Sequence, residues 1–241
     1  MELVFNFIAT YFRISIIAAL LPALVLMFLI YRQDRVEKEP AGLLFRLFLL
    51  GALVTIPVGL LEGLSISFLR TVFPNEMSAL YGFISNFLII ALIEEGGKYL
   101  VMRWSTWRHP AFNYRFDAVV YGSFTALGFA ASENILYVFR MGIGVAPVRA
   151  VTAIPLHCIC GIFMGHFYGM AKACERYGMK ARCVQYHALS LLLPMLVHGF
   201  YDFSVTSPYA AMQTVFLVFV IGLDIAAIIS VRKYARQDAR V

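Results

Sequence analysis

Long apolar stretches follow one another along the whole chain, separated by short polar segments. Their hydrophobic residues run on without the strict alternation of a strand, so each stretch predicts a helix. A helix needs about 20 residues to cross the ~30 Å hydrocarbon core of a bilayer, and every stretch is long enough. The pattern therefore predicts seven membrane-spanning helices, over residues 5–31, 41–70, 79–104, 116–140, 148–174, 184–206 and 211–231.

The composition agrees with this pattern, because 61% of the residues are hydrophobic and only 14% are charged. Soluble proteins carry about 25% charged residues, so a soluble fold is excluded. The first stretch runs beyond signal-peptide length, includes Arg13 and lacks a cleavage site, so we expect it to remain as a span. No soluble segment or repeat intervenes. We expect residues 1–241 to form a single all-α domain, a polytopic helical bundle in a lipid bilayer.

The basic residues lie between the apolar stretches and not on one patch, so the formal charge of +6 does not indicate a nucleic-acid partner. They alternate by loop, which is typical of topology signals. One set of loops carries Arg32, Arg35, Lys38, Arg103, Arg108, Arg115, Lys172, Arg176, Lys180, Arg182, Arg232, Lys233, Arg236 and Arg240. The other set carries only Arg70, Arg140 and Arg149. This asymmetry predicts an outer N-terminus and a cytoplasmic C-terminus.

The third apolar stretch contains Glu94, Glu95 and Lys98. Ionised groups in a membrane interior cost about 2.5–3.5 kcal/mol each on insertion scales, so they indicate a functional site. On a helix Lys98 lies four residues after Glu94 and three after Glu95, and it can therefore contact either carboxylate. We expect one carboxylate to stay charged while its neighbour serves as a general base.

Four more polar residues lie inside later spans: Glu133, His157, His198 and Asp202. At ~1.5 Å per residue, the first three lie about 10–14 Å from the outer helix ends, and Asp202 lies nearer the surface. We expect four helices to bring these side chains together in the outer half of the membrane.

This set predicts an open zinc site with Glu133, His157, His198 and Asp202 as candidate ligands. Asp202, four residues after His198, is either the fourth ligand or the acceptor that orients the imidazole. Glu94 or Glu95 would take the proton from a water molecule. A metal-free alternative uses the glutamates to activate water and the histidines to stabilise the oxyanion. No organic cofactor is expected.

Simpler explanations stand beside these hypotheses. A single membrane Glu or His is often a helix-to-helix hydrogen-bond partner. Gly161, Gly165 and Gly169 are explained by close helix packing. Several residues receive no functional role: the four cysteines, which lack CxxC spacing, and Glu62, His109, His166, His187 and Asp224.

Taken together, the motifs resemble the PrsW family of bacterial intramembrane proteases. The resemblance depends on EExxK (Glu94, Glu95, Lys98), FxxxE (Phe129, Glu133) and HxxxD (His198, Asp202), in that order. The acidic turn over residues 34–40 and the His157 helix with its glycines are also similar to the family. A more distant similarity links the chain to CAAX prenyl proteases and bacteriocin-processing enzymes.

The resemblance implies a membrane-embedded protease of the bacterial cytoplasmic membrane, with a single-span membrane protein as substrate. It implies Glu94 and Glu95 as catalytic residues, with Glu133, His157 and His198 catalytic or metal-binding. Some family members cut an anti-sigma factor on its extracytoplasmic side, which agrees with an outer-half site. Two other classes stay open: a proton- or cation-coupled transporter using the buried Glu/His cluster, and a scaffold with a structural polar cluster.

Overall fold

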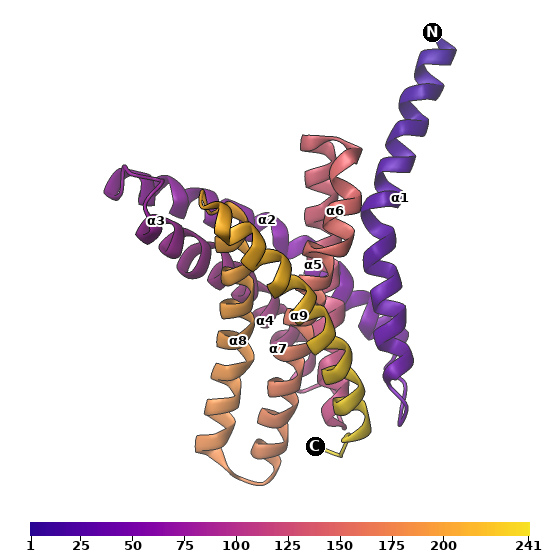
Figure 1. Cartoon of the computed structure of the whole chain (residues 1–241). Coiled ribbons are helices and arrows are strands. Elements are labelled where there is room, and N and C mark those ends of the chain that lie inside the picture. The colour runs from indigo at the N-terminus through magenta and orange to yellow at the C-terminus, as the bar shows by residue number, and fades with distance from the viewer.

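The computed structural model describes the backbone of residues 1–241 and the side chains of all of them except residues 2–4 and 7–8. The chain folds as helices joined by short loops (Figure 1). In chain order these are α1 (Glu2–Gln33), α2 (Ala41–Val72), α3 (Ala79–Phe83), the π-helix η1 (Ile84–Ala91), α4 (Leu92–Thr106), α5 (Arg115–Met141), the 3-10 helix η2 (Ile143–Val145), α6 (Ala146–Val151), α7 (Ala153–Arg176), α8 (Lys180–Thr206) and α9 (Ala210–Arg236).

Helices cover all seven stretches for which the sequence predicts spans, so the predicted all-α bundle is confirmed. In the part of the chain that the structure describes, six helical segments are long and apolar enough to cross a membrane. The seventh is α5, which is too polar to qualify by composition, yet it lies inside the bundle against α1, α2, α4 and α7. Its polar groups therefore meet protein instead of lipid.

Close backbone contacts hold α5 against α7. Gly161 of α7 lies so near Gly122 of α5 that an added Cβ would fall 2.6 Å from the Gly122 carbonyl oxygen. A Cβ added to Gly165 would fall 2.1 Å from the Ala118 carbonyl oxygen, and one added to Gly169 would fall 2.5 Å from that of Arg115. The packing interpretation of the α7 glycines is thus confirmed, and it explains how α7 brings a polar side chain close to α5.

The third span consists of three helical segments in direct succession, α3, η1 and α4. π-Helical turns are rare and frequently occur at functional sites. Here the π-helix ends directly before the turn that contains Glu94 and Glu95. Phe87 within it packs on Gly199 of α8, where a Cβ would lie 2.5 Å from the Phe87 ring. This contact fixes α8 beside the carboxylate pair.

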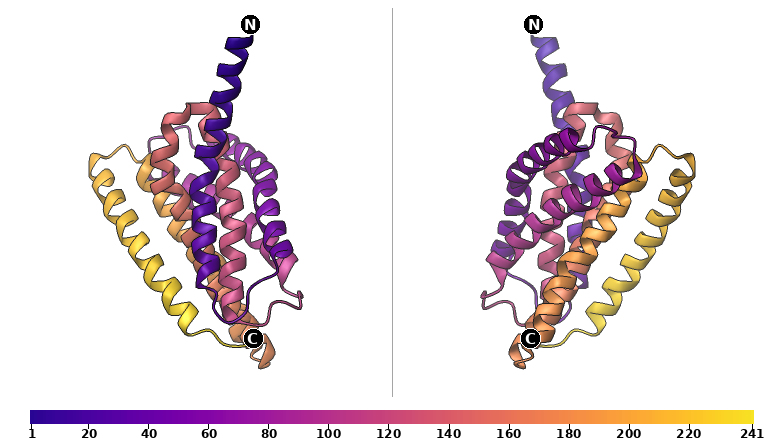
Figure 2. Two further views of the ribbon diagram at one scale, coloured as in Figure 1. Left: turned by 90° about the vertical axis from the view of Figure 1, so that its right-hand side faces the viewer. Right: turned by 90° about the vertical axis from the view of Figure 1, so that its left-hand side faces the viewer.

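The two chain ends lie at opposite ends of the bundle (Figure 2). The C-terminal tail returns to the loop before α5, where the Asp238 carboxylate accepts a 2.9 Å hydrogen bond from the Phe116 amide. A single bridge pairs Tyr114 with Arg240. Ends on opposite sides of the bundle agree with the prediction of an outer N-terminus and a cytoplasmic C-terminus, for one of the two orientations of the bundle in a membrane. That choice of direction stays a prediction.

Candidate active site

Four helices bring polar side chains together in the interior of the bundle. Glu94, Glu95 and Lys98 come from α4, and each is almost completely buried, with 5%, 0% and 0% of its surface exposed. Facing them are Glu133 of α5, His157 of α7, and His198 and Asp202 of α8. Glu133 and His198 each lie eight residues from an end of their helix, or about 12 Å deep.

Lys98 lies at the centre of this group. Its ammonium nitrogen is 2.9 Å from Oε2 of Glu94 and 2.8 Å from Oε1 of Glu95. The spacing of the EExxK motif predicts contact with either carboxylate, and the structure shows contact with both. The same ammonium lies 4.1 Å from the centroid of the Phe129 ring, a cation–π distance. Phe129 therefore closes one side of the Lys98 environment.

His157 connects Lys98 to Glu133. Its Nδ1 atom is 3.1 Å from Nζ of Lys98, and its Nε2 atom is 2.9 Å from Oε2 of Glu133. An ammonium group only donates, so Nδ1 of His157 accepts and the ring proton resides on Nε2. The imidazole thus donates to Glu133, and its second nitrogen faces the centre of the site.

His198 has the same orientation on the opposite side. Its Nδ1 atom lies 2.9 Å from Oε1 of Glu95, and its Nε2 atom lies 3.3 Å from Oδ2 of Asp202. The two imidazole rings are perpendicular, with centroids 5.1 Å apart. Both histidines therefore point Nδ1 toward the centre and Nε2 toward an outer carboxylate. Carboxylates placed behind histidines in this way fix the orientation of the ring. His157 has a defined tautomer, whereas His198 lies between two carboxylates and can donate to both only with a proton on each nitrogen.

The donors that converge most closely differ from the set that the sequence predicts as ligands. One atom each from Glu94, Glu95, His157 and His198 lies within 4.8 Å of the others. Two carboxylates with two imidazoles are a donor set that suits zinc. In addition, Oε2 of Glu95 is buried and has no hydrogen-bond partner among the described side chains. These residues therefore fit a divalent cation, and an unpaired acceptor is available for one.

Glu133 and Asp202 occupy the outer positions of the network. Oε2 of Glu133 already lies 2.9 Å from both His157 and a guanidinium nitrogen of Arg149. About a fifth of each outer carboxylate side chain is exposed, 21% for Glu133 and 22% for Asp202. The network therefore reaches the surface at both ends, while its centre is enclosed.

The charges of the cluster do not balance by themselves. It contains four carboxylates, and its two permanent cations are Lys98 and Arg149. Buried charges require partners, because desolvation is costly. Protons on the histidines or a divalent cation would supply the missing positive charge.

Two charged residues of the site carry no signal in the sequence motifs. Arg149 of α6 is identified by its basic charge only as a topology signal, yet it donates to Glu133 and, at 2.9 Å, to Oδ1 of Asn134. Glu62 of α2 is isolated in the sequence. In the structure its Oε1 atom is buried without a hydrogen-bond partner among the described side chains, and the charges acting on it include Glu94 and Glu133.

The other histidines lie outside the cluster, as expected from the sequence. His166 stacks on Tyr234, with 3.7 Å between ring centroids. His187 lies against Tyr99 and Trp107, and His109 contacts the amide of Ala111. Asp224 lines a different cavity on α9.

Comparison with known proteins agrees with this geometry. Residues 39–227 match the family described as PrsW family intramembrane metalloprotease. The chain is 35% identical over 216 residues to a protein named Protease PrsW from Oceanobacillus iheyensis, covering 90% of this chain and 94% of that relative. Relatives of the same name from Clostridioides difficile and Bacillus subtilis are each 32% identical, over 92% and 79% of this chain and 92% and 82% of their own length. No solved structure matches the chain.

Proposed function

Because the chain belongs to the PrsW family of intramembrane proteases, we propose that its buried Glu/Lys/His cluster hydrolyses a peptide bond of a membrane-anchored protein. The observation that carries this proposal is the unpaired Oε2 atom of Glu95, which lies beside two oriented imidazoles. A buried carboxylate oxygen without a donor is available to accept a proton from water.

Glu95 is the proposed general base. Lys98 and His198 both hold its Oε1 atom, at 2.8 and 2.9 Å, so Oε2 has a fixed direction. Water transfers a proton to Oε2, and its oxygen forms a bond with the carbonyl carbon of the substrate. The carboxylic acid then returns that proton to the leaving nitrogen as the C–N bond breaks. The products are a new carboxyl end and a new amino end.

The neighbouring groups position the base and stabilise negative charge on the attacked carbonyl oxygen. Lys98 and His198 are the N–H donors nearest Glu95. Donors that are already oriented in a site without bulk water contribute most to stabilising such an oxyanion. Glu94 shares Lys98 with Glu95 and keeps the ammonium in place.

In the zinc form of the chemistry, Glu94 and the Nδ1 atoms of His157 and His198 would hold the ion, with Glu95 next to them as the base. The Nδ1 atoms would then give up their contacts with Lys98 and Glu95, and the N–H role of His198 belongs to the metal-free form only. A zinc ion in such a site lowers the pKa of bound water and polarises the substrate carbonyl. In this arrangement Glu133 and Asp202, which the sequence predicts as ligands, act by orienting the two histidines.

A cavity lined by sequence neighbours of the cluster, though by none of the cluster residues themselves, is the proposed entrance for a substrate segment. It has a volume of about 280 Å³ and lies between α2, η1 and α8. Its wall includes Ile90, one helical turn before Glu94, and Phe203, which directly follows Asp202. A single-span substrate, such as an anti-sigma factor cut near its extracytoplasmic side, would enter the site by this route. The cavity lies at the end of the bundle that the charge pattern predicts to be outside.

The test is cleavage in proteoliposomes that hold the purified protein and tagged single-span candidates from the same genome. The wild type is expected to cut a candidate, and Glu95→Gln is expected to abolish the product. Glu175→Gln, at the far end of the bundle, serves as the matched control and should cut normally. Cleavage by Glu95→Gln at the wild-type rate would overturn the assignment. Ion flux without any proteolysis would support a transporter instead.

A further inference from the structure

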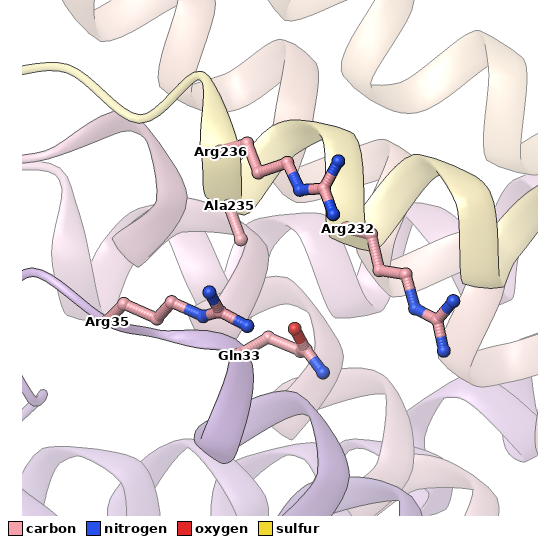
Figure 3. A pocket seen from close by; sticks show the side chains of 5 residues that line it. All are labelled: Gln33, Arg35, Arg232, Ala235 and Arg236. Carbon is pink, nitrogen blue, oxygen red and sulfur yellow. The ribbon is translucent and has the colours of Figure 1, made fainter.

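A second pocket, remote from the Glu/His cluster, lies where the C-terminal ends of α1 and α9 come together. It has a volume of about 310 Å³, and its lining consists of Gln33, Arg35, Arg232, Ala235 and Arg236 (Figure 3). Figure 3 shows Arg35 and Gln33 on one side of this pocket and the two α9 arginines on the other. Three guanidinium groups from two distant parts of the chain therefore share one space.

No acidic residue lines this pocket. Among the side chains that the structure describes, none forms a salt bridge with any of the three arginines. Of the nearby carboxylates, Asp34 is buried and Asp238 accepts the amides of Phe116 and Ala239. Each guanidinium has five N–H donors, and planar anions such as phosphate and carboxylate match their geometry. The pocket thus has the charge and donors for an anion.

An apolar cavity of about 450 Å³ adjoins the basic pocket. It lies between α1, α7 and α9, and Gln33 and Arg232 line both spaces. Its wall includes Leu29, Ile159 and Ile228. Leu29 and Ile228 are about half exposed, 49% and 55%, on the face of spans that would meet lipid. A charged pocket therefore continues directly into a hydrophobic groove on the membrane side.

We propose that these two spaces form one binding site for an anionic phospholipid. The phosphate group would be held by Arg35, Arg232 and Arg236, and the acyl chains would lie in the groove between α1 and α9. Basic pockets between transmembrane helices at the cytoplasmic surface are suited to anionic head groups. A soluble anion would occupy the basic pocket and leave the apolar groove empty. A zwitterionic head group would place its own positive charge next to the three guanidinium groups, without a negative partner.

Asp224 is the acidic residue that lines the groove, and its position is compatible with a bound anionic phospholipid. It lies eight residues before Arg232, about 12 Å farther into the membrane, so it does not neutralise the head-group pocket. A protein segment in the groove would be expected to place a basic residue against Asp224. Lipid binding predicts that Asp224→Asn retains the ligand, whereas loss of the ligand in this variant would favour a peptide.

The first test measures lipid retention by native mass spectrometry, using the full-length protein from nanodiscs of phosphatidylglycerol or phosphatidylcholine. We expect the wild type to retain one phosphatidylglycerol and little phosphatidylcholine. The double variant Arg232→Gln/Arg236→Gln should retain it about tenfold less, since it loses charge-assisted hydrogen bonds. The matched control is Lys233→Gln, which removes the adjacent charge from the same helix but does not line the pocket. An equal loss in this control would reduce the effect to general electrostatics and overturn the site.

The second test separates a lipid from a soluble anion. Ile228→Trp should fill the groove and lower phosphatidylglycerol retention, whereas Ile229→Trp, which is also exposed but outside the lining, should not. Added phosphatidylglycerol should raise the melting temperature of the wild type by about 3 °C or more in detergent. Inorganic phosphate should not. Stabilisation by inorganic phosphate alone, together with a silent Ile228→Trp, would overturn the lipid assignment, as would equal retention of both lipids.

Discussion

The ammonium nitrogen of Lys98 lies 3.1 Å from Nδ1 of His157, and this contact determines which atoms donate and which accept along the hydrogen bonds from Lys98 to Glu133. Because lysine only donates, His157 accepts at Nδ1 and donates from Nε2 to Glu133. Glu133 in turn pairs with Arg149 near the surface. A single buried cation therefore links α4 to α7, and through them to α5 and α6.

Replacing Lys98 by methionine is expected to destabilise the protein strongly. The substitution leaves Glu94 and Glu95 buried without their shared cation. Removing one partner of a buried ion pair typically costs about 3–5 kcal/mol. The measurement is thermal unfolding in detergent, and the double variant Lys98→Met/Glu94→Gln should recover part of the loss. A single variant that melts like the wild type would show that another cation holds the two carboxylates.

Glu133→Gln separates an orienting role from a ligand role. If Glu133 orients His157, the glutamine carbonyl still accepts the Nε2 proton, and only the ion pair with Arg149 is lost. We then expect kcat to fall by roughly 10–100-fold, the range for changes behind a metal-binding histidine. Metal content should stay near that of the wild type. Complete loss of both metal and activity would instead identify Glu133 as a ligand.

Glu62→Gln tests a further buried acidic group, on α2, which packs against α4. Its buried Oε1 atom has no hydrogen-bond partner among the described side chains, and the charges acting on it include Glu94, Glu133 and Lys98. We expect this carboxyl to contact the substrate or its leaving amine, so the variant should cut about 10–100-fold more slowly while folding normally. Kinetics and unfolding are measured on the same preparation. Wild-type kinetics in a stable variant would assign Glu62 no part in the reaction.

Much of the site follows from local spacing. The i+3 and i+4 positions of Lys98 relative to the two glutamates predict the ion pairs that the structure shows, since helix geometry alone brings such residues together. Depth along each helix also predicts that Glu133, His157 and His198 share a layer. Whether Asp202 acts as a ligand or orients His198 is open from spacing, and the structure places it against Nε2 of His198.

The remaining features depend on tertiary packing, which local patterns do not encode. Arg149 contacts Glu133 because α6 packs against α5 after the turn that joins them. No residue spacing in the sequence predicts this turn. Glu62 is a single acid on a helix with many exposed apolar residues, without a periodic partner. The basic pocket exists because α1 and α9 end side by side, although these ends are about 200 residues apart in the chain. The π-helix before Glu94 likewise is not predicted by any local residue pattern.

The acidic turn before α2 is expected to make stability depend on pH. Burial raises the pKa of Glu39 to about 7 and that of Asp34 to about 6, and repulsion from Glu37 raises both further. Between pH 4.5 and 7 the folded protein keeps a proton on Glu39 that the unfolded chain releases, so stability falls as the pH rises through this range. A change in the pKa of Glu39 from 4.5 to about 7 corresponds to roughly 3 kcal/mol.

Glu39→Gln should remove about half of this dependence, because the pKa of Asp34 is raised by a similar amount. The amide oxygen still accepts the hydrogen bond that the Tyr121 hydroxyl donates to Glu39. We expect the variant to melt at a higher temperature than the wild type at pH 8 and at a similar temperature at pH 4.5. Melting curves in detergent across this range test the sign. A wild type that becomes more stable as the pH rises would contradict the assignment.

Metal removal decides between the two forms of the proposed chemistry. Because Glu94, Glu95, His157 and His198 converge within 4.8 Å, a divalent cation held there by Glu94 and the two histidines should keep both imidazoles neutral and leave Glu95 beside it as the base. Purified protein is then expected to contain about one zinc per chain, to lose activity on dialysis against a chelator and to regain it with zinc. His157→Ala and His198→Ala should lose the metal, whereas His166→Ala, whose ring stacks on Tyr234 outside the cluster, should retain it. Activity that survives the chelator in metal-free protein would leave Glu95 as the base, with Lys98 and His198 as the donors that hold it and stabilise the oxyanion.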